Sequence, residues 1–231
     1  MAGRSFFIDT TRCTACRGCQ TACKQWNRNP GTKTVQRGTY QNPEDLSSAT
    51  FKLVRFSDPA VQPGGYPTWY FFPDQCRHCV YPPCKMVADG RAPGSVRLDV
   101  KTRAIVFNPE IKVSDSDFKE IRKACPYDIP RHNAKSGGMA KCTMCIDRIN
   151  EGLLPACVKT CPTGTMNFGD RDEMLEMAAE RLAEVKKNHR NASLVKPDFV
   201  RVIFLLKDAP AKYHRFAAGL ISYQRDKSGG A

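Results

Sequence analysis

Short apolar runs, each bounded by polar and turn-forming residues, predict β-strands in four parts of this chain. Residues 4–10 (RSFFIDT), 69–75 (WYFFPDQ) and 103–109 (RAIVFNP) have the length and composition of short strands. Near the C-terminus, residues 199–207 (FVRVIFLLK) form a further apolar run. Between residues 27 and 68, Pro, Gly, Thr and Asn are frequent, with one strand-like piece, TFKLVRF, so we expect a long connection there.

Two segments have the apolar pattern and the charge distribution of helices. Residues 171–189 (RDEMLEMAAERLAEVKKNH) repeat apolar side chains at helical spacing, with acidic residues early and basic residues late. Residues 114–124 (SDSDFKEIRKA) begin with serines that can cap a helix and end with basic residues. In this second helix Phe118 and Ile121 lie three positions apart, so they share one face and can point into the protein.

The composition allows a buried core and indicates metal binding. The chain has 231 residues, of which 41% are hydrophobic, so it can form one large or two small domains. Disulfides are therefore not needed to compensate for small size. Most of the 12 cysteines lie close to another cysteine in the sequence, and such clusters favour metal binding over a disulfide framework.

Neither an export signal nor a membrane helix is predicted. The N-terminal residues MAGRSFFIDTTRC lack the basic, apolar and small-residue regions of a secretory signal. The longest apolar stretch, FVRVIFLL, contains Arg201 and is far shorter than the roughly 20 residues of a membrane helix. We therefore expect a soluble chain that does not span a membrane and does not direct its own export.

The first cysteine group, CTACRGCQTAC, has the spacing C-x2-C-x2-C-x3-C that is typical of ferredoxins. In that pattern three thiolates hold one [4Fe–4S] cluster, and the fourth thiolate binds a neighbouring cluster. The rule pairs the first group of this chain with the last, which contains CTMC and CVKTCP. It predicts one cluster on Cys13, Cys16, Cys19 and Cys161, and a second cluster on Cys142, Cys145, Cys157 and Cys23.

The middle group, CRHCVYPPC, has three cysteines, and the solitary Cys125 is the one left to complete it. The third predicted cluster therefore has the ligands Cys76, Cys79, Cys84 and Cys125. A fourth cluster would need cysteines ten, seven and four residues before Cys125 and four residues after Cys84. These fourth-site positions are Asp115, Phe118, Ile121 and Ala88. Because all four ligands are missing together, we interpret them as one lost cluster whose volume Phe118 and Ile121 fill. An ordinary amphipathic helix that never held metal is the alternative.

Zinc is the competing metal for C-x2-C pairs, and it suits CTMC with Cys157 and Cys161. Zinc does not explain a run of four cysteines within eleven residues, nor the prolines that follow Cys125 and Cys161. A zinc-binding interaction protein therefore stays the less favoured alternative.

Other candidate residues lie next to the predicted ligands. The basic ones are Arg12, Arg17, Lys24, Arg77 and Lys141. Their charges can raise cluster potentials, or they can be ordinary solvated surface residues. His78, which lies between two ligands, and His132 are expected to be packing or surface residues and not metal ligands.

The formal net charge of the chain is +13 with neutral cysteines. Each oxidised cluster with its four thiolates contributes about −2, so three clusters would leave about +7. Lys and Arg are scattered through the sequence, and no nucleic-acid motif is recognisable. A docking face for a less basic partner protein is therefore favoured over nucleic acid.

Four stretches resemble the iron–sulfur electron-transfer subunits of molybdenum or tungsten bis-pterin oxidoreductases: RCTACRGCQTACKQWN, FFPDQCRHCVYPPCK, ACPYDIPR and GLLPACVKTCPTGTMNFGD. Within that family they are similar to the beta subunit of soluble formate dehydrogenases of sulfate-reducing bacteria. Most members carry one cluster more than this sequence can bind, whereas that soluble subunit has the cluster count predicted above.

The resemblance implies an α+β fold with two ferredoxin-like (βαββαβ) cluster-binding units, one inserted in the other. Residues 1–26 and 137–170 form the first unit, with two clusters, and residues 69–136 form the inserted unit, with one cluster and the lost site. Residues 27–68 are the long connection. Residues 171–231 form a C-terminal helix, strand and tail, and we expect this strand and tail to lie against the partner subunit.

The resemblance also implies a non-catalytic subunit that relays electrons between a molybdenum or tungsten catalytic subunit, which interconverts formate and carbon dioxide, and an external acceptor such as a c-type cytochrome. The first predicted cluster should face the catalytic subunit, the second should follow, and the third should be the outlet. A heterodimer co-exported to the periplasm by a twin-arginine signal on the catalytic subunit is expected, with the cytoplasm as the alternative. Nitrate, polysulfide and sulfoxide reductases stay open as alternative catalytic partners.

Overall fold

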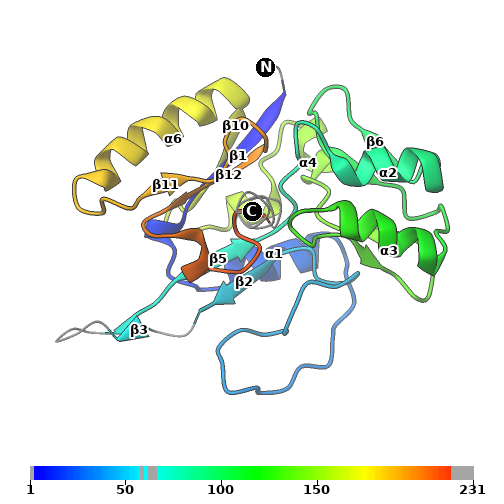
Figure 1. The fold of residues 1–231 in the computed structure, drawn as a ribbon, viewed down its shortest axis with the longest axis horizontal. Helices are drawn as coiled ribbons and strands as arrows, with labels where there is room; N and C mark the ends of the chain where they lie inside the picture. Colours follow the sequence, from blue (N-terminus) through cyan, green and yellow to red (C-terminus); the bar gives the residue numbers. More distant parts are fainter. Residues whose placement is uncertain (1–2, 58–59, 62–66, 220–231) are drawn as a thin grey trace, which may run out of the picture.

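The computed structural model describes residues 3–57, 60–61 and 67–219, and its largest sheet has four strands in the order β10-β1-β12-β11 (Figure 1). These strands are β1 (Arg4–Asp9), β10 (Met166–Asp170), β11 (Ser193–Leu194) and β12 (Val202–Leu206). β1 pairs antiparallel with β10 and parallel with β12, so that Phe6 lies opposite both Phe168 and Val202. The sheet therefore joins segments from the two ends of the described chain, and the strand predicted at residues 4–10 is confirmed.

Strand β12 lies in the interior of this sheet, between β1 and β11. All five of its residues are buried, because Val202 and Phe204 belong to the main core while Ile203 and Leu205 pack in the cluster that includes α6. A strand that is apolar at every position is typically covered on both faces. The predicted strand is thus confirmed, but the expectation that it lies against a partner subunit is wrong. The predicted tail from residue 220 onward lies outside the described residues.

Helix α6 (Arg171–Lys186) covers one face of the sheet, in agreement with its predicted helical pattern (Figure 1). Its buried apolar side chains are Met174, Ala178 and Val185. The helix begins after Asp170, whose backbone N–H donates to the Glu173 side chain at 3.3 Å. Acidic residues in the first turn and a lysine in the last turn suit the helix dipole.

A second group of short elements lies beside the sheet, on the right in Figure 1. Helices α2 (Pro83–Arg91) and α3 (Asp115–Ala124) pack against each other there. The accompanying hairpins are β6 (Val96–Leu98) with β7 (Ile105–Phe107), and β8 (Arg131–His132) with β9 (Met139–Ala140). Helix α3 is capped as predicted, since the Ser114 hydroxyl accepts a hydrogen bond from the backbone N–H of Asp117 at 3.1 Å.

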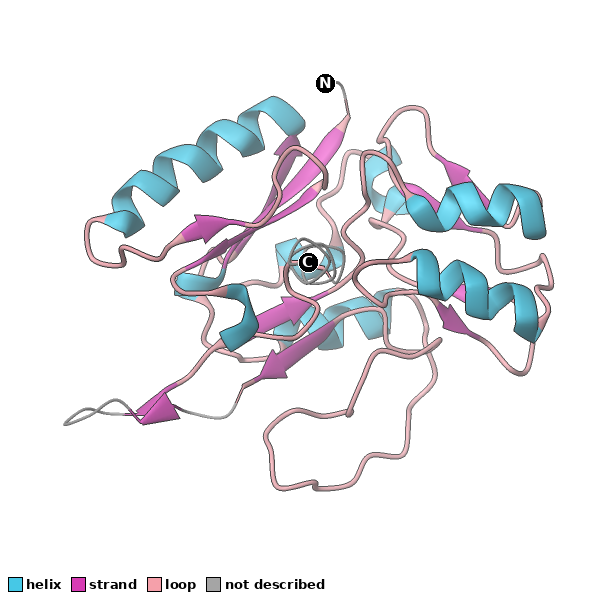
Figure 2. Ribbon diagram, in the orientation of Figure 1, coloured by secondary structure: helices cyan, strands magenta, loops and turns pink. Residues whose placement is uncertain are grey.

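The segment predicted as a long connection has no helix or strand from residue 27 to residue 52, apart from a bridge between Ser47 and Thr50. Strand β2 (Leu53–Phe56) then pairs with β5 (Phe71–Asp74), and β3 (Ala60–Val61) pairs with β4 (Pro67–Thr68). The remaining elements are α1 (Gly18–Trp26), α4 (Ile146–Asn150), α5 (Ala156–Lys159) and 3-10 turns at Thr10–Arg12 and Pro210–Lys212. Long loops connect most of these elements (Figure 2).

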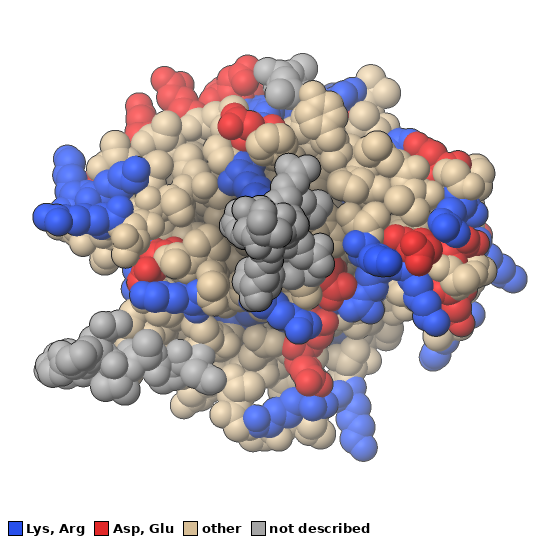
Figure 3. Space-filling model, in the orientation of Figure 1, with Lys and Arg blue, Asp and Glu red and all other residues tan. Residues whose placement is uncertain are grey.

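The architecture is a mixed α+β fold, as the sequence predicts. Helix α1 packs against α5, just as α2 packs against α3. On the face shown in Figure 3, Lys and Arg side chains are interspersed with Asp and Glu side chains and form no single basic stripe. In the described parts of the chain, none of the helices combines the length and the apolar character needed to cross a membrane.

Candidate metal-cluster sites

All twelve cysteines are free thiols, and the structure brings them together in three groups. Each group contains at least one cysteine from a distant part of the chain. We name the groups site 1 (Cys13, Cys16, Cys19 and Cys161), site 2 (Cys142, Cys145, Cys157 and Cys23) and site 3 (Cys76, Cys79, Cys84 and Cys125). The grouping agrees with the spacing rule, and the ligand assignment itself stays a prediction.

Sites 1 and 3 are cavities lined by their four cysteines. Val54, Pro73 and Met166 line the site 1 cavity beside the thiols. Ile105 lines the site 3 cavity beside its thiols. Cys125, which is solitary in the sequence, therefore completes a group in the fold.

Site 2 joins Cys23 of α1 to three cysteines near α4 and α5. Burial raises the pKa of Cys23 well above its usual value, and the three other thiolates of the site raise it further. Burial likewise raises the pKa of Cys142, to about 12. Thiolates raise one another's pKa in this way when their sulfur atoms lie near one another in a poorly solvated place.

The electrostatic contacts between sites indicate a row with site 2 in the middle. Burial is the main cause of the raised pKa of Cys142, and the Cys76 thiolate of site 3 is the next. Burial is also the main cause for Cys157, to which the Cys19 thiolate of site 1 contributes as well. Site 2 therefore neighbours both of the other sites.

The same backbone turn recurs in three cysteine loops. Ala15, His78 and Met144 each precede the second cysteine of a C-x2-C pair, and their φ angles are 54°, 45° and 63°. The backbone N–H of His78 donates to Cys76 Sγ at 3.3 Å. The N–H of Met144 donates in the same way to Cys142 Sγ at 3.4 Å. The left-handed conformation costs a non-glycine residue about 1–2 kcal/mol, and N–H···S hydrogen bonds stabilise a thiolate.

The two Cys-Pro turns also share one conformation. Asp128 and Gly164, each three positions after its cysteine, have φ angles of 52° and 67°. In both turns the N–H groups two and four positions after the cysteine bond to its sulfur. Burial raises the pKa of Cys161, but hydrogen bonds from the backbone N–H of Met166 and then from Thr163 and Thr165 outweigh it and lower the pKa below its usual value. For Cys125 burial prevails, and its pKa is raised to about 11. The repeat makes Cys125 the structural equivalent of Cys161.

Comparison with known proteins adds the family. A family model described as a 4Fe–4S dicluster domain matches residues 67–171. The chain is 53% identical over 214 residues to formate dehydrogenase subunit beta of Megalodesulfovibrio gigas, covering 93% of this chain and 98% of the relative. It is 50% identical over 215 residues to formate dehydrogenase 2 subunit beta (cytochrome c-553) of Nitratidesulfovibrio vulgaris, again covering 93% and 98%. The formate dehydrogenase-O iron–sulfur subunit of Escherichia coli is 37% identical over 213 residues, which cover 90% of this chain and 68% of that one.

The chain belongs to the iron–sulfur (beta) subunits of formate dehydrogenase. It is an electron-transfer subunit of the formate dehydrogenase complex and binds [4Fe–4S] clusters. The expectation from the sequence is confirmed at this level.

The three sites of this formate dehydrogenase subunit fit cubane clusters in their donors and surroundings. Each offers four thiols, and most of the sulfur atoms are poorly solvated and receive backbone N–H bonds. Within residues 3–57, 60–61 and 67–219, no group of three or more His, Cys, Asp or Glu side chains is arranged to hold a single metal ion, as structural zinc would require. The raised pKa values are those of free thiols, which lose their protons when they bind metal.

Two of the five basic residues predicted beside the ligands are buried, and the other three are exposed or half-buried. Arg77 is 1% exposed, and its guanidinium pairs with Asp74 at 2.8 Å. Lys141 is also buried, at 4% exposed. The exposed or half-buried ones are Arg12, Arg17 and Lys24. A further buried cation, Lys52, was not predicted from the sequence, because no cysteine lies near it along the chain.

Both histidines have structural partners, in agreement with the prediction. The fully buried His78 ring accepts a hydrogen bond from the backbone N–H of Ile105 at 3.1 Å. The His132 ring lies 3.1 Å from the Asp115 carboxylate and stacks on Phe118.

Apolar packing fills most of the fourth-site positions. Ala88 and Ile121 are fully buried and Phe118 is 9% exposed, all in one core cluster with Cys84. Asp115 differs, because its side chain is 84% exposed. The prediction that Phe118 and Ile121 turn inward on one helix face is confirmed.

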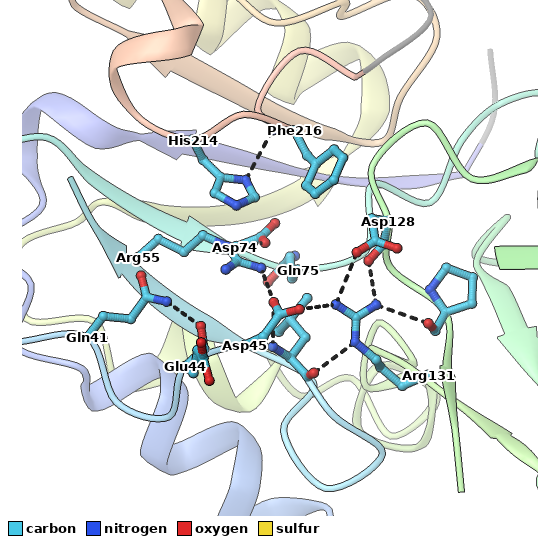
Figure 4. A network of polar contacts seen from close by, with 12 residues as sticks. Gln41, Glu44, Asp45, Arg55, Asp74, Gln75, Asp128, Arg131, His214 and Phe216 are labelled. Carbon is cyan, nitrogen blue, oxygen red and sulfur yellow. Dashed lines mark hydrogen bonds and ion pairs between the residues drawn. The ribbon is translucent and has the colours of Figure 1, made fainter. Parts of the chain in front are cut away.

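A polar network, which the sequence does not predict, ties the Cys125 turn to the long connection (Figure 4). Arg131 pairs with Asp45 of the connection at 2.7 Å and lies 3.6 Å from Asp128 of the turn. Arg55 of β2 then joins Asp45 to the buried Asp74, with contacts of 2.6 and 2.7 Å. No spacing signal marks these residues, since the contact of Arg131 with Asp45 joins segments that are 86 positions apart in the sequence.

Proposed function

We propose that this subunit holds three [4Fe–4S] clusters with all twelve cysteines as ligands. Sites 1, 2 and 3 supply four thiolates each, as defined above. The convergence of distant cysteines into three groups of four, with none left over, carries the proposal. The repeated turns that point backbone N–H groups at sulfur atoms support it, because such hydrogen bonds stabilise thiolate ligands.

We also propose two ferredoxin-like (βαββαβ) units, one inserted in the other. Residues 1–26 and 137–170 form the first unit and residues 69–136 the second, with residues 27–68 as the connection and 171–231 as the C-terminal addition. The matching helix pairs, α1 with α5 and α2 with α3, support two equivalent units. The shared conformation of the two Cys-Pro turns supports them too.

For the direction of electron flow we propose that site 1 faces the catalytic subunit, site 2 is intermediate and site 3 is the outlet. When bound, each cluster accepts and releases one electron. The position of site 2 beside both other sites supports the middle place. The orientation of the row follows the family resemblance, and site 3 next to the catalytic subunit would overturn it.

We propose that the subunit catalyses no reaction itself and forms a heterodimer with a molybdenum or tungsten bis-pterin catalytic subunit that converts formate to carbon dioxide. A soluble c-type cytochrome is the proposed acceptor, and the name of the Nitratidesulfovibrio vulgaris relative, which includes cytochrome c-553, supports this. The proposed location is the periplasm, reached by co-export with the catalytic subunit. Fractionation of cells with and without the twin-arginine signal of that subunit tests the location.

The deciding experiment is the anaerobic analysis of iron and acid-labile sulfide, combined with electron paramagnetic resonance (EPR) of the reduced protein. About twelve iron and twelve sulfide per chain are expected, with three interacting cubane signals. Four clusters would mean that a non-cysteine ligand completes the fourth site, and zinc without sulfide would refute the electron-transfer assignment.

A matched pair of variants tests the ligand assignment. Cys125→Ser should damage only the site 3 cluster, and Cys161→Ser, at the equivalent turn, should damage only the site 1 cluster. The grouping would be contradicted if both variants lost the same EPR signal, or if either variant lost the signal of the site 2 cluster.

A further inference from the structure

Two lysines are buried in this subunit without a carboxylate partner. Lys52 is 2% exposed and Lys141 is 4% exposed. Buried Arg55 and Arg77 both pair with Asp74, at 2.7 and 2.8 Å. In the described part of the chain, by contrast, the hydrogen bonds of both lysine ammonium groups go to neutral oxygen atoms. A cation removed from water needs a compensating negative charge, so these two lysines require another source of it.

Lys52 lies between site 1 and site 2. Its ammonium group donates to the Pro73 carbonyl at 3.3 Å and to Gln75 Oε1 at 2.6 Å. Pro73 lines the site 1 cavity. Burial lowers the pKa of Lys52, but the thiolates of Cys19 in site 1 and of Cys157 in site 2 raise it above its usual value. The negative charge that Lys52 faces is therefore that of two sites at once.

Lys141 lies in the same way between site 2 and site 3. Its ammonium group donates to the carbonyl of Cys142, a site 2 residue, at 3.0 Å, and also to the Ile105 carbonyl. Lys141 and Ile105 both line the site 3 cavity. Lys141 therefore contacts a site 2 residue and borders the site 3 cavity at the same time.

We propose that Lys52, between sites 1 and 2, and Lys141, between sites 2 and 3, each raise the midpoint potentials of the two clusters beside them. The proposal rests on the three-cluster function above. A cluster becomes more negative when it is reduced, so a fixed positive charge nearby favours the reduced form. Because each lysine is shared, one fixed charge favours reduction at both of the sites beside it. The sequence suggests such a role for Lys141, next to Cys142, whereas only the fold places Lys52.

The test is an EPR-monitored redox titration of the purified heterodimer that carries Lys52→Met or Lys141→Met. Methionine keeps most of the apolar stem and removes the charge. Lys52→Met should lower the midpoint potentials of sites 1 and 2 and leave that of site 3 in place. Lys141→Met should lower those of sites 2 and 3 and leave that of site 1. Lys186→Met, at an exposed lysine in the last turn of α6, is the control and should shift no potential.

Iron content separates this inference from the proposed function. About twelve iron per chain in every variant means that three clusters are present, and the potentials then decide. Potentials that stay unchanged, or that all shift equally, would overturn the lysine proposal alone. Wild-type protein with a different iron count would instead count against the three-cluster assignment.

If Lys52→Met loses iron, two other variants of Lys52 test the effect of its charge: Lys52→Arg, which keeps the charge, and Lys52→Gln, which is neutral and polar. Lys52→Arg should keep the wild-type potentials, and Lys52→Gln should lower those of sites 1 and 2. Equal potentials in these two variants would show that the charge of Lys52 has no such effect. The Cys125→Ser and Cys161→Ser proteins identify which signal belongs to which site.

Discussion

Replacing Asp128 by alanine tests how the Cys125 turn is held at site 3. Asp128 has a φ angle of 52°, in the left-handed region that aspartate tolerates better than alanine. Its carboxylate accepts hydrogen bonds from Arg122 Nε at 2.6 Å and from the terminal NH2 group of Arg122 at 2.9 Å. The pair is only partly exposed, since the arginine side chain is 39% and the aspartate side chain 20% exposed. The substitution therefore places an alanine in a strained backbone conformation and also removes a bidentate ion pair.

The expected destabilisation is about 2 kcal/mol. The left-handed conformation contributes about 1 kcal/mol when aspartate becomes alanine, and a partly exposed bidentate pair contributes up to about 1 kcal/mol. In a chain of this size the sum lowers the apparent Tm by roughly 4–8 °C. Asp128→Asn should lose about half as much, because asparagine tolerates the conformation and keeps one acceptor for Arg122.

The assay is an anaerobic thermal scan of the heterodimer at one fixed rate, with EPR spectra of samples taken along the scan. In Asp128→Ala the site 3 signal should disappear first, while the signals of sites 1 and 2 persist to higher temperature. Asp89→Ala is the control, because Asp89 is 52% exposed and forms an ordinary surface pair with Lys85 at 2.6 Å. A wild-type Tm for Asp128→Ala, or earlier loss of site 1, would refute the reasoning.

Three other measurements test the core, the C-terminal loop and the fourth-site positions. Ile121→Ala should lower the free energy of unfolding by about 2–5 kcal/mol, because Ile121 is fully buried. The control Lys119→Ala, at an exposed position of the same helix, should change it by less than about 0.5 kcal/mol. Equal losses of the two variants in denaturant unfolding would contradict the packing. Burial, followed by the Arg55 guanidinium, lowers the pKa of His214 to about 4. As the pH falls below about 6.5, the histidine of the unfolded state takes up a proton while His214 of the folded state stays neutral, and this favours unfolding. Between pH 7 and pH 5 the wild type should therefore lose about 2 kcal/mol more stability than His214→Gln. Parallel curves of stability against pH for the two proteins would contradict this. Cysteine at all four fourth-site positions should leave iron at about twelve per chain, and a rise to about sixteen would contradict the account of α3.

The C-x2-C pairs can be predicted from the sequence because their geometry is local. A C-x2-C pair can place two sulfur atoms on one side of a loop, whereas the distant fourth cysteine of each group comes from the ferredoxin rule, and its role as a ligand stays a prediction. The helix α3 is equally local, since Ser114 supplies the cap and Phe118 and Ile121 share a face. These features depend on residues a few positions apart, so a single sequence contains them.

Features that depend on long-range packing escape the same reading. Strand β12 has an apolar run that predicts a strand, but nothing in the run says that its neighbour is β1, almost two hundred residues earlier. Lys52 reads as an ordinary surface lysine until the fold buries it between two sites. The network of Asp45, Arg55 and Arg131 likewise joins the long connection to strands β2 and β8. In each case the sequence shows the type of residue, but it does not show which distant residue or strand that residue contacts.

The fourth-site positions show why four residues in the right register do not by themselves make a site. The cysteine loops at sites 1, 2 and 3 each place a left-handed residue before a ligand, which turns N–H groups toward sulfur. Helix α3 has no such turn in its ten residues, and its positions 115 and 121 face opposite environments, with the Asp115 side chain 84% exposed and Ile121 fully buried. Four thiols at these positions could therefore not converge unless the helix unwound and the core formed by Phe118 and Ile121 opened. Apolar packing and a cluster are alternative fillings of this half, and the structure shows the apolar packing.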